Sequence, residues 1–332
     1  GQIKGVIIES KLGRQAILGK VVVDCTGDAD LAVASGGPYV KGREKDSKIR
    51  PITLLFRMGN VDIDKLVECF KQNPDNFQKD HQSNVIDPEN KQVRVVGFFN
   101  EVKEARERGE VDRECHYIRI ETVFIDRRTV LINTTRVYDI DALDPVSLTK
   151  GTLEARKQVR QLETLLKKRI PGFEKSFLMD TAPLVGVRET RRVRGDYVLT
   201  EDDIAAGKEF TDSIGMNYMR HIPGNPLHSP DGKEGAEKDQ NARTIVAPLH
   251  SHGIPYRCLV PKNIEGLLVG GRCISVSHEA DDWTRNIPAC ILTGQAAGVA
   301  ASIACKENVQ PRDIDVAKLQ TVLRKQGVDI KR

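Results

Sequence analysis

The stretch Glu265–Ala304 constrains the fold more than any other part of this chain. Apolar residues 266–269 are typical of a short buried strand, which ends at Gly270-Gly271. Further on, Asn286 followed by Pro288 is typical of the start of a helix. The pattern therefore predicts a strand, a glycine turn and a helix start, whose free backbone N–H groups would form a cradle for an anion.

The helix that follows is rich in small residues, and a polar loop at 277–286 is expected before it. Gly294 and Gly298 lie four residues apart, and glycine lowers helix stability. We expect their face to lie close to a strand or to a ligand; the alternative is an ordinary buried helix packed on a sheet. Residues 287–304 carry no charge, but their Ala, Gly and Ser content favours a buried helix over a membrane span.

Composition narrows the class of protein. With 332 residues, 39% apolar and 30% charged, the chain is expected to be globular with two units. A net charge of +4 without long basic runs favours a small anionic ligand over nucleic acid. Seven dispersed cysteines predict free thiols and no metal site, and the polar start predicts a cytoplasmic protein. His250 and His252 lack an obvious third metal ligand.

Several secondary-structure elements can be predicted from periodicity. Residues 20–24 indicate a strand that feeds a helix after Gly27, where glycine lets the backbone approach a neighbour closely. The alternative is that Thr26-Gly27 forms a plain turn. Thr152–Ile170 is the clearest amphipathic helix, and Asp315–Gln326 is predicted to be an amphipathic closing helix. Residues 5–9 and 15–18 are predicted to form a hairpin with Gly13 in its turn. A mostly antiparallel sheet is expected from four β-rich runs, 51–58, 93–99, 117–125 and 129–138.

An arginine-rich segment is predicted to form one long strand, Val185–Leu199. In that strand Arg192 and Arg194 would either face water or face a ligand. A guanidinium at any of these positions could grip a carboxylate with two parallel hydrogen bonds.

The order of several motifs resembles a known family. Residues 270–275, 278–280, 285, 288–290 and 294–298 are similar to the C-terminal signature of FAD-dependent oxidoreductases related to the fumarate reductase and succinate dehydrogenase flavoproteins. Residues 24–32, 186–192 and 253–261 resemble further motifs of that family, so the resemblance covers most of the chain.

The resemblance implies an α/β fold, in which a discontinuous, partial FAD-binding Rossmann-like domain carries an inserted α+β substrate domain. We expect the FAD-binding domain at 1–38 and 256–332 and the inserted domain at 39–255. Such families hold the ADP half of FAD on a Gly-x-Gly-x-x-Gly turn, and this sequence contains none. We therefore expect the N-terminal lobe of the FAD-binding domain to be lacking.

The resemblance also assigns candidate site residues. Cofactor-binding candidates are Thr26, Gly27, Asp28, Gly270, Gly271, Arg272, Pro288 and Ala289. Catalytic candidates are His278, Glu279, Arg285 and Arg188. Arg188 and Arg191 are the better candidates among the arginines for gripping a carboxylate, because both lie in the family motif at 186–192. His278 would transfer a proton, and Arg285 would steady a substrate carboxylate or an anionic flavin. The alternative is that His278 and Glu279 only hydrogen-bond their own loop to its backbone.

These expectations converge on flavin-dependent oxidation or reduction of a small organic substrate, anionic or polyhydroxylated. The alternative is a split flavoprotein subunit that binds FAD only with a complementing N-terminal chain. A homo-oligomer, with a second copy of this chain as partner, is the other assembly expected. A lyase acting on sugars is a third class, but the sequence shows neither the paired carboxylates nor the tyrosine base expected of it.

Overall fold

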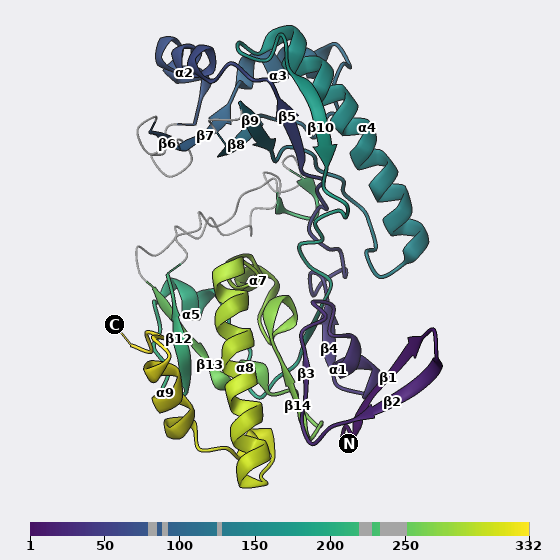
Figure 1. Ribbon diagram of the computed structural model, residues 1–332, viewed down its shortest axis with the longest axis vertical. Helices are drawn as coiled ribbons and strands as arrows, with labels where there is room; N and C mark the ends of the chain where they lie inside the picture. The colour runs from purple at the N-terminus through teal and green to yellow at the C-terminus, as the bar shows by residue number, and fades with distance from the viewer. Residues whose placement is uncertain (79–84, 88–91, 125–127, 219–227, 233–250, 332) are drawn as a thin grey trace. The chain divides into compact units, whose positions relative to one another are not determined.

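The computed structural model describes the chain except residues 79–84, 88–91, 125–127, 219–227, 233–250 and 332 (Figure 1). The chain forms two compact units. Unit 1 comprises Gly1–Arg50, Arg188–Ser229 and Glu234–Arg332, and unit 2 comprises Pro51–Val187 with Pro230–Lys233. Relative to the expected boundaries, residues 39–50, 188–229 and 251–255 group with both ends of the chain rather than with the insertion.

Unit 1 begins with a hairpin of β1 (Gly5–Ser10) and β2 (Gly13–Leu18), as the sequence predicts. The central pair of the unit is parallel: β3 (Val22–Asp24) lies beside β14 (Leu267–Val269). Each strand is followed by a turn and a helical element, α1 (Asp30–Ala34) after β3 and the short η5 (Gly271–Cys273) after β14. The remaining pairs are antiparallel, β4 (Tyr39–Lys41) with β11 (Arg191–Val193) and β12 (Ser213–Asn217) with β13 (His252–Pro255).

The helix α8 (Ile287–Glu307) runs beside β14 and β3 in Figure 1, and its buried alanines belong to the same core as both strands. A Cβ built on Gly270, at the end of β14, would lie 3.3 Å from the Cα of Gly294. The close approach of helix and strand therefore requires glycine at 270. A Cβ on Gly294 or Gly298 would meet no described atom within 4 Å, so a side chain at either position would not collide with the strand.

Two other helices complete unit 1, together with the short α5 (Glu201–Ala205), η4 (Tyr256–Leu259) and η6 (Pro311–Asp313). The C-terminal α9 (Val316–Lys325) is amphipathic, as predicted, and buries Leu319 and Leu323. The polar loop expected at 277–286 is wrong: residues 278–284 form the helix α7 (His278–Thr284), because the Ser277 side chain accepts a hydrogen bond from the Ala280 N–H and caps it. Among the described helices, α8 alone is long and apolar enough to cross a membrane, a test that core helices also pass.

Unit 2 is an antiparallel sheet with a long helix. The strand order is β10 (Phe177–Thr181), β5 (Phe56–Gly59), β9 (Thr129–Ile132), β8 (Ile118–Phe124), β7 (Gln92–Gly97) and β6 (Val85–Asp87). The helix α4 (Pro145–Arg169) shares one apolar core with this sheet, and its inward residues include Ala155, Val159, Leu162 and Leu166 (Figure 1). The elements α2 (Ile63–Gln72), η1 (Pro74–Asn76) and α3 (Phe99–Glu107) complete the unit.

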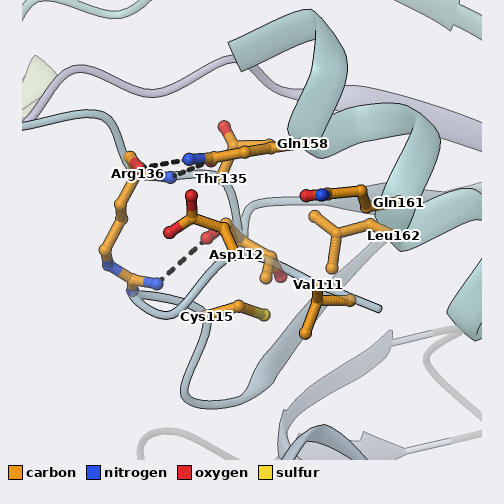
Figure 2. Close-up of a pocket in the computed structure, with 9 residues that line it drawn as sticks. Val111, Asp112, Cys115, Thr135, Arg136, Gln158, Gln161 and Leu162 are labelled. Atoms are coloured by element: carbon orange, nitrogen blue, oxygen red, sulfur yellow. Dashed lines mark hydrogen bonds between the residues drawn. The ribbon is translucent and has the colours of Figure 1, made fainter. Parts of the chain in front are cut away.

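The helix α4 begins seven residues before the predicted Thr152, because Asp144 caps it and Pro145 occupies its first turn. A small cavity of about 10 Å³ lies under it, lined by Gln158, Gln161, Arg136 and Asp112 among others (Figure 2). The Gln158 side chain accepts from the Arg136 N–H at 2.9 Å and donates to the Arg136 carbonyl at 2.7 Å. The cavity has room for about one water molecule, so it is not a substrate site.

Candidate active site

The expected cofactor-binding residues near β3 gather where the two parallel strands of unit 1 end. Ligands of α/β sheets bind at this edge. Asp24, the last residue of β3, is fully buried and accepts four hydrogen bonds, from the N–H and hydroxyl groups of Thr26 and from the N–H groups of Leu31 and Ala32. The Asp24 carboxylate thus already occupies the N-terminus of α1 and shapes the turn that carries Gly27.

The glycine turn after β14 does not form the expected anion cradle. The Gly270 N–H donates to the Asp24 carbonyl at 3.0 Å, and the Gly271 N–H donates to the Thr293 hydroxyl at 2.9 Å. Both donors are therefore engaged within the protein. Their hydrogen bonds tie the turn to β3 on one side and to α8 on the other.

Arg272 lies at the same edge and has one hydrogen-bond donor without a partner among the described residues. One of its terminal nitrogens, Nη2, lies 2.8 Å from Asp28 Oδ1, and a Cβ on Gly27 would lie 2.9 Å from it. Gly27 itself has φ of +82°, a conformation that favours glycine. The other terminal nitrogen, Nη1, is enclosed and has no hydrogen-bond partner among the described residues. An enclosed guanidinium nitrogen without a partner fits a phosphate or carboxylate oxygen.

Pro288 and Ala289 lie in the first turn of α8, whose start at Asn286 has no side-chain cap. Both residues line a cavity of about 350 Å³ together with Asn217, Tyr218 and Gln295. The two expected cofactor residues are thus linked to the β14 turn through α8, by the hydrogen bond between Gly271 and Thr293 one turn further on.

The catalytic candidate His278 lies at the start of α7 and is buried. Its Nδ1 lies 2.8 Å from Oε1 of Glu189, which is fully buried. Burial, and then the positive charge of Arg50, hold the pKa of His278 below its usual value, so the imidazole is neutral at pH 7. The ring therefore contacts a carboxylate from a distant segment rather than the backbone of its own loop.

Arg50 is a buried residue of this cluster that sequence reasoning missed. Its Nη2 donates to the His278 carbonyl at 2.6 Å, and its Nη1 lies 3.5 Å from the His228 carbonyl. Its Nε lies 3.6 Å from Asp281 Oδ2 and 3.9 Å from Glu189 Oε2. Arg50 thus neutralises two buried carboxylates and holds the backbone of two histidines.

Asp281 is the second missed residue, and it is fully buried. Neither of its carboxylate oxygens has a hydrogen-bond partner among the described residues, although Arg50 and Arg285 lie within 4 Å. Burial, and then the negative charge of Glu189, raise the pKa of Asp281 to about 6. The side chain therefore titrates close to neutral pH.

Arg192 contradicts the water-facing alternative, because it is 1% exposed. It is hydrogen-bonded to Glu189 Oε1 and donates to the carbonyls of Val276 and Gly42, both at 3.0 Å. The predicted long strand is also wrong: only Arg191–Val193 forms β11. In one regular strand the side chains alternate between faces, so Glu189 and Arg192 would lie on opposite faces. Here they are hydrogen-bonded to each other instead.

The other catalytic candidates differ in their surroundings. Arg285 binds Asp282 of its own helix, with Nε 3.1 Å from Oδ1, and Glu279 is exposed. Arg188 is half-buried, and its charge, like that of Arg285, adds to burial in lowering the pKa of His228 to about 3. The positive charges of Arg188 and Arg285 therefore both act on His228, whose carbonyl faces Arg50.

No group of three or more His, Cys, Asp or Glu side chains among the described residues could hold a metal ion. His252 is buried, which lowers its pKa to about 4, and His250 lies outside the described residues. The cysteines are all free thiols, as the sequence predicts.

Only Glu189 among the missed residues lies in a motif that could have identified it, residues 186–192. Arg50 and Asp281 carry no local signal of their role.

In a comparison with protein families, the family model described as FAD dependent oxidoreductase matches residues 1–323. No curated protein and no solved structure matches the chain significantly.

Proposed function

Since this chain belongs to the FAD-dependent oxidoreductase family, we propose that it oxidises or reduces a small organic substrate, anionic or polyhydroxylated, beside the buried cluster of His278, Glu189 and Arg50. The observation that carries the proposal is a neutral imidazole set against a buried carboxylate and surrounded by arginines. Such a group can accept a proton while nearby cations attract an anion.

The cofactor of this family is FAD, and the described residues fit it. The fit rests on the enclosed Nη1 of Arg272 beside Gly27, because a dinucleotide phosphate supplies the acceptor which that donor lacks. Arg272, Gly27 and the first turn of α8 at Pro288 and Ala289 would hold it. FAD supplies the redox chemistry, exchanging a hydride or electrons with the substrate.

The chain's own residues would contribute proton transfer and binding. His278 exchanges a proton with the substrate at the ring nitrogen that does not contact Glu189. Arg188 grips a substrate carboxylate or hydroxyl groups, since a guanidinium donates two parallel hydrogen bonds. Arg285 is held by Asp282 and supplies positive charge nearby.

A split flavoprotein is the alternative, and two observations favour it. The sequence has no Gly-x-Gly-x-x-Gly turn, and the Gly270 and Gly271 N–H groups are engaged within the protein. Under this alternative a complementing N-terminal chain supplies the diphosphate contacts. We also propose that the FAD-binding domain is discontinuous and that the chain is related to the fumarate reductase flavoproteins. A homo-oligomer and a cytoplasmic location are proposed as well.

The purified protein is titrated with FAD and desalted, and its absorbance is then measured in the flavin bands. This experiment distinguishes FAD binding by this chain alone from the split-subunit alternative. We expect weak binding by this chain alone, weakened further by Arg272→Gln and unchanged by Arg14→Gln, whose side chain lies in an exposed ion pair. Stoichiometric retention would exclude the split alternative. FAD binding that ignores Arg272→Gln would contradict the assigned phosphate contact.

Reduction of bound flavin under anaerobic conditions tests the substrate class. Small hydroxy acids and sugar acids should bleach the flavin absorbance faster than neutral alcohols of equal size. Equal rates for both classes would contradict an anionic substrate.

A further inference from the structure

We propose that Glu189 and Arg50 are positioning residues that fix His278 as a neutral imidazole with its proton on Nδ1 and its lone pair on Nε2, which makes it a proton acceptor. The proton-accepting role rests on the proposed function, whereas the tautomer is a property of the chain itself. The consequence is that His278 acts as a general base rather than as a general acid.

The first observation is the partner of Nδ1. Glu189 Oε1 lies 2.8 Å from it and is also hydrogen-bonded to Arg192 Nη1. Glu189 Oε2 lies 3.9 Å from Arg50 Nε. Burial raises the pKa of Glu189, although the charges of Arg192 and Arg50 oppose that rise. Because Oε1 already accepts the hydrogen bond from Arg192 Nη1, it presents a lone pair to His278, and Nδ1 carries the proton of their hydrogen bond.

The second observation is the freedom of the other nitrogen. His278 Nε2 makes no hydrogen bond to a described residue, and it is not among the enclosed polar atoms that lack a partner. It therefore keeps access to the surroundings of the buried ring. A lone pair at this position is available to a substrate proton.

The third observation is how the charges around the ring are balanced. The groups that act on His278 are Arg50 and Arg192, which disfavour the imidazolium, and Glu279 and Asp281, which favour it. Arg50 also fixes the backbone through the 2.6 Å hydrogen bond to the His278 carbonyl. The same residue thus holds the ring in place and keeps it neutral.

The tautomer can be measured without cofactor or substrate, by long-range ¹H–¹⁵N correlation spectra of histidine-labelled protein. His278→Gln assigns the signal. We expect wild type to show the Nδ1–H tautomer with no protonation between about pH 5 and 8. A wild-type spectrum with the proton on Nε2 would overturn the proposal, whether or not the protein proves to be an oxidoreductase.

Variants of Glu189 then test its positioning role. The carboxamide of Glu189→Gln can donate to Nδ1, so the Nε2–H tautomer should gain population, whereas Glu189→Asp should retain the wild-type tautomer. Glu9→Gln, in an exposed pair with Arg14, is the matched control and should change nothing. An unchanged tautomer in folded Glu189→Gln contradicts the role of Glu189; if that variant fails to fold, the wild-type and Glu189→Asp spectra decide.

Discussion

Gly270 lies against the backbone of Gly294, so closely that a Cβ on Gly270 would come within 3.3 Å of the Gly294 Cα and 3.1 Å of the Cys25 sulfur. The relation is not reciprocal, because a Cβ on Gly294 meets no described atom within 4 Å. The two glycines therefore differ in why the fold uses them. Gly270 permits the contact between β14 and α8, and Gly294 leaves the surface of the helix open.

Alanine at these two positions should consequently have opposite effects. Gly270→Ala should destabilise unit 1 by about 1–3 kcal/mol through overpacking. Gly294→Ala should be neutral or stabilise the helix by up to about 1 kcal/mol, because glycine is a poor helix former. Chemical unfolding followed by circular dichroism measures both; a larger loss in Gly294→Ala would contradict this account of the helix contact.

Two glutamines of α4, Gln158 and Gln161, provide a second matched pair of variants. Gln158→Leu leaves the Arg136 N–H and carbonyl without their partners and should cost about 1–3 kcal/mol. Gln161→Leu should cost less, because the Gln161 side-chain oxygen has no hydrogen-bond partner among the described residues (Figure 2). Thermal unfolding of both variants tests the order, and equal losses would show that the double hydrogen bond adds little.

Asp281 should make folding stability depend on pH. Its pKa rises from 3.8 to about 6 on folding, so the folded state binds the proton more tightly. Its contribution to stability is therefore full below about pH 4 and is lost as the pH rises to about 6. Asp281→Asn removes this dependence, and its free energy of unfolding relative to wild type should increase across that window by on the order of 1–3 kcal/mol.

Urea unfolding at several pH values measures that difference, in which the histidine contributions common to both proteins cancel. Asp180→Asn is the control, because the exposed Asp180 pairs with Arg57, which lowers its pKa. The dependence on pH should there have the opposite sign. A difference between Asp281→Asn and wild type that stays constant with pH would show that Asp281 is not protonated in the folded state near pH 5.

Arg188→Lys tests the substrate side of the proposed site. Lysine keeps the charge but loses the planar fork, so turnover should fall while flavin content stays unchanged. The measurement compares kcat and KM with the flavin absorbance per protein, and Arg14→Lys serves as the exposed control. Loss of flavin in Arg188→Lys would place Arg188 on the cofactor instead.

The sequence by itself determined the elements whose pattern is local. The β1–β2 hairpin follows from the turn at Gly13 between two β-rich runs. The amphipathic α4 and α9 and the antiparallel sheet follow from periodicity, because a period of 2 or 3.6 residues directly encodes a buried face. The order of the motifs likewise sufficed to indicate the FAD-dependent family.

Tertiary structure alone decided which buried charges meet. Arg50 and His278 are 228 residues apart and His278 and Glu189 are 89 apart, yet one hydrogen bond joins each pair. Periodicity cannot predict such pairing, because a charged residue reads as solvent-exposed until the fold supplies its partner. For the same reason Arg192 and Asp281 gave no sign of burial, and only the packing of α7 against the segment around Glu189 made them part of the site.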